Sequence, residues 1–309
     1  MSSTKSIKQR IKSVKNTSQI TKAMEVVSAT KMRKSQGFAL SARPYASASL
    51  EMLKNLLSRS PTLPPLLASR TVNNSVLLVV TSDKGLAGAF NSNCIKKAEA
   101  WVKEKKQKKE PYALVTVGKK ARDYFERRKE PIQESFWGFG DYSSLEDTLP
   151  VAKTIMDGFS LESWDEVWAV YTNFRTTLVQ EAVLKKLLPV TKEGIEEAVV
   201  SILPERGKYA SDKRQAISDK LYTYEYKFEP SPAEILNELV PQLIRMHVHH
   251  IILESNASEH SARMVAMKSA SDNAKDLISK LTLDFNKSRQ AGITRELTEI
   301  TAGKEALEQ

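Results

Sequence analysis

The stretch "SARMVAMKSASDNAKDLISKLTLDFNKSRQ", residues 261–290, decides the fold of this chain of 309 residues. It lies in a segment with no proline after Pro241 and no glycine before Gly292, so nothing in it breaks a helix. A helix from Ala233 to Thr301 would be roughly 100 Å long at 1.5 Å per residue, and no compact domain of this size can bury such a rod along its whole length. We therefore expect the helix to find a partner helix or to project into another protein.

The beginning of the chain supplies the partner, because a second helix is expected from about Ser6 to Leu57. Its apolar residues form two offset sets with helical spacing, so we expect the seam to drift around the helix: Ile7, Ile11 and Val14, then Ile20, Met24 and Val27. The two terminal helices should wind into an antiparallel coiled coil. The C-terminal helix is the longer one, so one of its ends should stand alone. Its last turns suit a thin helical tip that is closely surrounded by another protein, because they have only three strong apolar anchors: Ile293, Leu297 and Ile300.

The middle of the chain alternates between strand-like and helix-like runs. Strands are expected at 75–80, 112–117 and 166–174, with a fourth candidate at 221–228, and helices around 95–109, 119–128 and 144–159. Such alternation predicts a mostly parallel sheet covered on both faces. The predicted fold class is α+β: a long antiparallel two-helix coiled coil from the N- and C-termini, with an inserted Rossmann-like α/β domain. The expected parts are residues 1–60, the α/β domain at 70–228 and the C-terminal helix at 229–309.

The loop "TSDKGLAGAFN", residues 81–91, follows the first strand as a phosphate-binding loop would, but its spacing fits no nucleotide motif. A Walker A loop needs GxxxxGK[ST], and a dinucleotide fingerprint needs GxGxxG. Only Gly85 and Gly88 are present, which favours a strand-to-helix turn with glycines for tight geometry and close packing.

Other candidate sites are equally weak. Two of the four histidines, His247 and His250, are helical neighbours that could share a metal, but without an acidic cluster they are expected on a polar face. Cys94 is the only cysteine, so no internal disulfide can form. We expect no catalytic, cofactor or metal site on this chain.

The formal net charge of +10 indicates a polyanionic or acidic neighbour. Two alternative functions are a basic coiled-coil protein that binds nucleic acid and a nucleotide-binding enzyme. No apolar run approaches the ~18 residues needed to span a bilayer, and the N-terminus lacks the apolar core of a secretory signal. The lysine-rich run 103–109 is interpreted as the solvated face of a helix.

Three stretches resemble the signature regions of the gamma subunit of the rotary (F-type) ATP synthases, in the family's order: Ile7–Gln36, Thr81–Asn91 and Ser258–Gly303. The resemblance implies a central rotor shaft inside a hexamer of alpha and beta subunits. It couples proton-driven rotation of the membrane c-ring to ATP synthesis or hydrolysis in that hexamer. It also implies an epsilon subunit as a partner, catalysis by the partners, and no nucleotide or nucleic acid bound by this chain. The expected location is the cytoplasmic face of the bacterial inner membrane, as a peripheral membrane protein.

The chain departs from the family pattern at Ala87 and Ala89, where the family often has a cysteine and a second glycine. The two-cysteine redox insert of the chloroplast version is absent, because Cys94 is the only cysteine. Neither departure affects the role of a shaft.

The resemblance also implies partner contacts for particular residues. Met24 stands where the family faces a mobile acidic loop of the beta subunit, although it could instead belong to the coiled-coil core. Tyr226 and Glu229 resemble positions that rest on polar loops of the membrane ring, although the stretch could be an edge strand. Near the C-terminus, three residues resemble those that grip a loop of one beta subunit, although they could form a solvated polar face: Arg289, Gln290 and Thr294.

Overall fold

The computed structural model describes residues 4–41, 48–49, 52–53, 56, 64–140, 143–190 and 228–307. The chain divides into two compact units. Met1–Ser28 and Arg263–Gln309 form the first, and Ala29–Ala262 form the second. Two long helices, α1 (Thr4–Ser41) and α8 (Pro232–Leu307), each contribute to both units.

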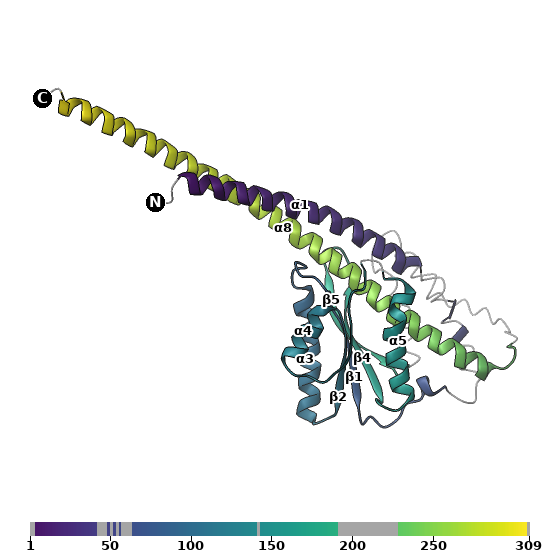
Figure 1. Cartoon of the computed structure of the whole chain (residues 1–309). Helices are drawn as coiled ribbons and strands as arrows, with labels where there is room; N and C mark the ends of the chain where they lie inside the picture. Colours follow the sequence, from purple (N-terminus) through teal and green to yellow (C-terminus); the bar gives the residue numbers. More distant parts are fainter. Residues whose placement is uncertain are drawn as a thin grey trace. The chain divides into compact units, whose positions relative to one another are not determined.

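In the first unit, the ends of α1 and α8 run side by side in opposite directions (Figure 1). On each helix the less exposed positions recur four and three residues apart, which is the heptad spacing of a coiled-coil seam. On α1 they are Ile7, Ile11, Val14, Ser18, Thr21, Glu25 and Ser28. On α8 they are Met267, Ser271, Ala274, Ile278, Leu281, Phe285 and Ser288. The predicted antiparallel pairing of the terminal helices is confirmed.

The predicted drift of the α1 seam is wrong. Ile20 and Val27 are 59% and 52% exposed, whereas Thr21 and Ser28, one position further along, are buried. A strict heptad keeps one stripe of α1 against its partner, so position in the heptad outweighs the hydrophobicity of a single residue. Small seam residues also let two helix backbones approach closely. The described part of α1 ends at Ser41, so the expected continuation to residue 57 lies largely outside the described residues.

The second unit contains a five-stranded sheet in the order β3-β2-β1-β4-β5. The strands are β1 (Ser75–Val80), β2 (Tyr112–Val117), β3 (Ile132–Phe136), β4 (Glu166–Phe174) and β5 (Gln180–Leu188). The first four are parallel, and β5 runs antiparallel to β4. The crossover helices are α3 (Phe90–Lys108), α4 (Lys119–Arg127) and α5 (Leu145–Ser160), and a short turn of 3-10 helix, η1, spans Pro65–Leu67. Three predicted strands and three predicted helices are thus confirmed.

Two strands, β3 and β5, were not predicted from the sequence. β3 is a short edge strand with mostly polar residues, "IQESF". β5, "QEAVLKKLL", consists largely of good helix formers, and its buried Leu187 and Leu188 follow Val183 and Leu184 at helical spacing. Pairing with β4 overrides that preference. The candidate strand at 221–228 lies outside the described residues except for Phe228.

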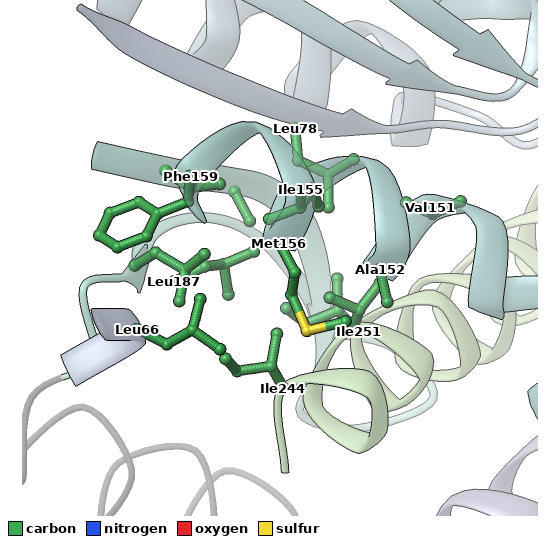
Figure 2. Close-up of a cluster of buried hydrophobic side chains, with 14 of the residues drawn as sticks. Leu66, Leu78, Val151, Ala152, Ile155, Met156, Phe159, Leu187, Ile244 and Ile251 are labelled. Carbon is green, nitrogen blue, oxygen red and sulfur yellow. The ribbon is translucent and has the colours of Figure 1, made fainter. Parts of the chain in front are cut away.

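Apolar side chains fill the space between the sheet, α5 and the first part of α8 (Figure 2). The α5 helix contributes Ile155 and Phe159, and α8 contributes Ile244 and Ile251. A smaller cluster, centred on Leu77, Trp101 and Phe125, lies on the other face of the sheet under α3 and α4. The sheet is therefore covered on both faces, as predicted.

Further along, α8 is buried although its residues are polar. The β4–β5 hairpin satisfies several of them: Ser258 donates to the Thr172 carbonyl at 3.1 Å, and Ser261 donates to that of Thr177 at 2.7 Å. His250 is buried and His247 is half-buried, so the expectation that these two histidines lie on a polar face is wrong for His250. The reason is that this part of α8 packs against neighbours that the helix's own sequence does not show.

Candidate partner interface

The last turns of α8 have no covering neighbour among the described residues. Leu281 is the last buried residue of the helix, and every described residue from Ile293 to Lys304 is exposed. Ile293, Leu297 and Ile300 are 50%, 59% and 68% exposed and share one helical face through +4 and +3 spacing. Apolar side chains on an uncovered face are typical of a surface that binds a partner. The predicted free tip of the C-terminal helix is confirmed in this respect.

Polar side chains border this apolar stripe. Gln290 lies three residues before Ile293, and Thr294 lies three before Leu297, so both belong to the same side of the helix. Arg289, Gln290 and Thr294 are all exposed, and their side chains make no hydrogen bond or ion pair within the part of the chain that is described. Arg295 differs, because its Nε lies 2.9 Å from a carboxylate oxygen of Glu299.

Two glycines, Gly292 and Gly303, lie within the last turns of α8. A Cβ placed on Gly292 or Gly303 would meet nothing within 4 Å. Neither glycine is therefore required by packing within this chain, and α8 tolerates them despite their low helix propensity.

A second exposed apolar surface lies on α1 in the first unit. Ile20, Val26 and Val27 are exposed there, and Met24 beside them is half-buried. Met24 lies outside the heptad positions of the seam. Ile20 and Val27, with which Met24 was expected to share an apolar seam, are exposed, but Met24 lies three residues after buried Thr21 and four before buried Ser28, so packing within the helix pair stays an alternative. Lys22 on the same stretch is paired with Glu25 at 3.0 Å.

The expected ring contacts are not brought together by the described structure. Tyr226 lies outside the described residues. Glu229 is exposed, just before α8 begins.

The loop after β1 uses its polar groups internally. The first amides of α4 donate to it: that of Lys119 to Asp83 at 2.9 Å, that of Lys120 to the Ser82 carbonyl at 3.2 Å, and that of Ala121 to Thr81 Oγ1 at 2.9 Å. Asp83 accepts a further bond from the amide of Gly138 at 2.8 Å. These bonds therefore join the loop after β1 to the start of α4, the helix that follows β2.

The glycines of this loop only partly fulfil the expected role. Gly88 has φ +55°, as a tight turn needs, but Gly85 has open space around it and Leu86 takes φ +63° instead. Close packing is provided by Gly118 at the end of β2, where a Cβ would lie 2.2 Å from the Thr81 carbonyl oxygen.

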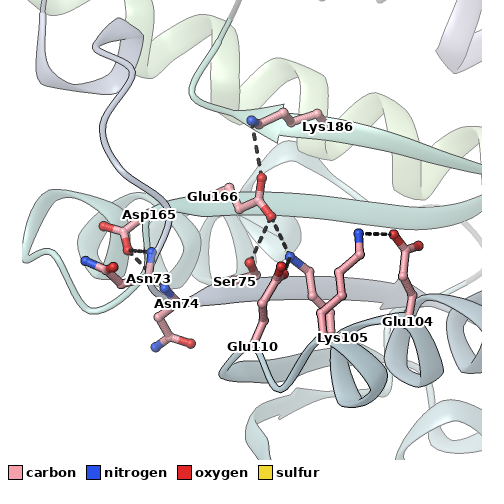
Figure 3. Close-up of polar contacts among 10 residues, drawn as sticks. Asn73, Asn74, Ser75, Glu104, Lys105, Glu110, Asp165, Glu166 and Lys186 are labelled. Carbon is pink, nitrogen blue, oxygen red and sulfur yellow. Dashed lines mark hydrogen bonds and ion pairs between the residues drawn. The ribbon is translucent and has the colours of Figure 1, made fainter.

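A pocket of about 350 Å³ lies where α3 ends and β4 begins, and Figure 3 shows its charged groups. Glu166 accepts hydrogen bonds from Ser75 at 2.8 Å and Lys105 at 3.0 Å, and it pairs with Lys186 at 3.3 Å. Burial alone would raise the pKa of Glu166, but these contacts outweigh it and the pKa lies below its ordinary value. Within the pocket the buried charges therefore neutralise one another.

The described ranges contain no cluster of three or more histidine, cysteine, aspartate or glutamate side chains able to hold a metal ion. Cys94 is buried against the Val80 carbonyl, and burial raises the pKa of its thiol to about 12. None of the described helices has the length and apolarity to cross a membrane.

The geometry defines a class of protein: a two-helix stalk with an exposed helical tip, whose chain carries an inserted α/β domain. A family model described as ATP synthase matches residues 3–307. The ATP synthase gamma chain of Herpetosiphon aurantiacus is 40% identical over 318 residues and covers 100% of both chains. The gamma chain of Geotalea daltonii is 41% identical, with 99% of both covered. This chain belongs to the ATP synthase gamma-chain family.

Solved structures show the same fold at lower identity. A chain in a structure of the Euglena gracilis mitochondrial ATP synthase (OSCP/F1/c-ring, rotational state 3) has a TM-score of 0.62 at 18% identity, with 98% of this chain and 94% of that one covered. A chain from the central stalk and c-ring of the Tetrahymena thermophila enzyme has a TM-score of 0.58 at 21% identity, covering 82% of this chain and 99% of that one.

Two exposed apolar residues were missed as site candidates from sequence. Val26 was not assigned to any surface, and Leu283 lies close to buried Leu281 but is 64% exposed. The heptad spacing of the buried positions, applied strictly, would have placed both outside the seam.

Proposed function

We propose that this chain turns as the central shaft of an ATP synthase and that the free tip of α8 engages the catalytic partners. The observation that carries this proposal is the uncovered stripe of Ile293, Leu297 and Ile300, bordered by the unengaged side chains of Arg289 and Gln290. Exposing these apolar side chains to water is unfavourable in free energy. Burial against a surrounding partner protein would remove that unfavourable term.

An asymmetric shaft explains the coupling. Its faces differ, so three copies of a catalytic subunit around it meet different contacts and differ in nucleotide affinity. Rotation exchanges those contacts, and the coupling free energy passes through side chains. Arg289 can hold a carboxylate with two hydrogen bonds, and Gln290 can donate and accept at once. Each bond to a charged group contributes roughly 1.5–3 kcal/mol, enough to favour one rotary position and small enough to break on each turn.

Membership of the family supports proposals for the partners and for the location. The gamma chain is a non-catalytic subunit, and we assign the alpha and beta subunits, the epsilon subunit and the c-ring as partners. The spacing of Gly85 and Gly88, which fits no nucleotide motif, supports the further proposal that this chain itself has no nucleotide site. We place it on the cytoplasmic face of the bacterial inner membrane.

The two remaining contacts are proposals on narrower grounds. The exposed α1 residues beside Met24 support a beta-subunit contact there, and the exposed position of Glu229 is compatible with a ring contact. For the ring contact, charge reversal at Glu229 should weaken assembly with the ring and leave ATPase of the detached head intact. A loss of head ATPase would instead indicate a folding defect.

The main test substitutes the tip. Arg289→Ala and Gln290→Ala should each impair assembly or steady-state ATPase of the complex, because each removes a contact to the sleeve. Arg295→Ala is the matched control: it removes the same charge from an arginine already paired with Glu299, and its effect should be smaller. Helicity of the free chain, measured by circular dichroism, should be unchanged in all three. Normal assembly and turnover in both tip variants would refute the proposed contact.

Nucleic-acid binding is the alternative that the charge allows. It would show as a DNA affinity that falls steeply with salt, measured on the isolated chain.

A further inference from the structure

A short sequence repeats at two neighbouring turns of the α/β domain. "KKEPY" (residues 108–112) joins α3 to β2, and "RKEPI" (residues 128–132) joins α4 to β3. Because β2 and β3 are adjacent and parallel, both turns lie at the same edge of the sheet, where the strands begin. The two turns are also tied together, since Glu130 accepts hydrogen bonds from Lys106 and Tyr112 at 2.7 and 2.6 Å.

The two turns share an uncommon backbone. Lys109 and Lys129 follow the ends of their helices with φ of +57° and +56°. This left-handed position is usually occupied by glycine or asparagine. The amide after each lysine reaches back to a carbonyl five residues earlier, Glu110 to Lys105 and Glu130 to Phe125, as in a Schellman motif. A lysine at both positions is therefore not explained by backbone geometry.

The charges at this edge are sorted by direction. The glutamates of the repeat are engaged within the domain: Glu110 pairs with Lys105 at 2.7 Å, and Glu130 pairs with Lys106 at 2.7 Å. The side chains of Lys103, Lys109 and Lys129 are exposed and make no ion pair or hydrogen bond with any residue that the structure describes. The side chain of Glu130 is 10% exposed, and that of Glu110 is 42% exposed but paired. The exposed Glu162 at this edge lies 3.9 Å from Arg70, so the acids here have cationic partners, whereas these three lysines have no described counter-charge.

A third turn at the same edge adds an apolar group. α5 ends there before β4 begins, and Leu161 at its end is 77% exposed. α5 covers the opposite face of the sheet from α3 and α4, so Leu161 shares the edge with the lysines across the sheet. Lysines near a helix end also complement the helix dipole, but that role does not require an exposed leucine at the same edge. Outward lysines together with an exposed leucine suit the surface of an anionic bilayer, where the leucine can enter the interface.

We propose that this edge, defined by Lys103, Lys109, Lys129 and Leu161, binds the phosphate headgroups of an anionic membrane surface. The contact is separate from the tip of α8 and does not depend on the shaft role. It would hold the α/β domain close to the bilayer through several weak contacts that exchange readily.

The test measures partition of the full chain onto vesicles of phosphatidylcholine with 30% phosphatidylglycerol at about 100 mM salt. Lys109→Asn/Lys129→Asn keeps a residue suited to the left-handed backbone and removes two charges. It should lower the partition coefficient by roughly 25-fold, since each of the two lysines near such a surface contributes about a factor of five. Lys96→Gln/Lys97→Gln removes two exposed charges from the other end of α3 and should change it less than twofold.

Leu161→Ser separates a bilayer from other polyanions. It should weaken binding to the anionic vesicles but leave any binding to duplex DNA or polyglutamate unchanged. The proposal would be overturned if Lys109→Asn/Lys129→Asn and Lys96→Gln/Lys97→Gln lowered the partition coefficient equally. It would also be overturned if the first of these variants left the partition coefficient unchanged. Because no catalytic subunit is present in this assay, its failure leaves the shaft function intact, and a failure of assembly leaves this proposal intact.

Discussion

At the scale of single residues, the α/β domain contains a buried carboxylate and a close contact between two backbone segments. Glu254 of α8 lies in the interior, where its carboxylate accepts a 3.4 Å bond from the Phe174 amide. Burial raises the pKa of Glu254 to about 8, against smaller lowering effects of that hydrogen bond and of Lys185. Gly118 allows β2 to pass within contact of Thr81. Both residues lead to direct tests.

The pKa of Glu254 predicts a pH-dependent stability. Below about pH 4.5 both the folded and unfolded states carry the proton. As pH rises to about 8, only the unfolded state ionises, so the free energy of unfolding falls by about 1.4 kcal/mol per pH unit. Glu254→Gln should remove this slope and become increasingly stabilising, relative to the original chain, between pH 5 and pH 8. Urea unfolding at pH 5, 6.5 and 8 measures the difference in unfolding free energy between Glu254→Gln and the original chain. The same difference at all three pH values would contradict a raised pKa for Glu254.

Gly118→Ala should destabilise the α/β domain by about 3 kcal/mol, because it combines backbone strain at φ +92° with a Cβ 2.2 Å from the Thr81 carbonyl oxygen. Gly85→Ala is the control. That glycine has open space and no left-handed φ, so its substitution should stay within about 0.5 kcal/mol. Urea unfolding of both variants gives the comparison, and similar losses in the two would show that the close approach is not responsible.

At the scale of elements, the first unit is held by a narrow seam. Only one stripe of each helix is covered, and several of its positions are small or polar, such as Ser28, Ser271 and Ala274. The few large apolar seam residues therefore carry most of the packing energy. The same narrowness leaves other faces of both helices free for partners.

Leu281→Ala should loosen this helix pair by about 2 kcal/mol, because it removes a buried seam side chain. Leu283→Ala deletes the same atoms from a residue that is 64% exposed and should have little effect on the isolated chain. Hydrogen exchange across residues 267–288 reports the difference. Faster exchange in both variants would mean that the seam is misassigned.

At the scale of the whole molecule, the chain belongs to the gamma-chain family, and the contacts proposed for it lie on exposed surfaces of both units. The α8 tip and the α1 surface around Met24 both lie in the first unit. The repeated turns at the start of β2 and β3 lie in the second. Each surface can therefore be altered without touching the core of the other unit.

Met24→Lys should uncouple ATP hydrolysis from proton transport in the assembled complex, because a new cation beside the acidic beta-subunit loop would over-stabilise that contact. Met24→Leu keeps the size without the charge and should stay coupled. Proton pumping per ATP hydrolysed, in reconstituted vesicles, is the measurement. Normal coupling in Met24→Lys would favour the alternative that Met24 only packs within the helix pair.

The sequence by itself determined the elements whose signals are local. Uninterrupted helical periodicity gave α8 and its pairing with α1, and continuous apolar runs gave β1, β2 and most of β4. Spacing alone predicted that residues 81–91 do not form a phosphate loop, and this stays a prediction. The structure adds that Thr81 and Asp83 of this loop accept hydrogen bonds from the first amides of α4. The exposed tip also followed from sequence, since no second helix of the chain is long enough to cover it.

Only the tertiary structure decided which face of each element is covered. Ile20 and Thr21 are adjacent on α1, and the register against α8 buries the threonine rather than the isoleucine. β5 has the composition of a helix and becomes a strand because β4 offers it a paired edge. His250 and Glu254 look solvated by residue type but are enclosed by neighbours far away in the sequence. Periodicity specifies the shape of an element, whereas burial depends on contacts that form only when the elements pack together.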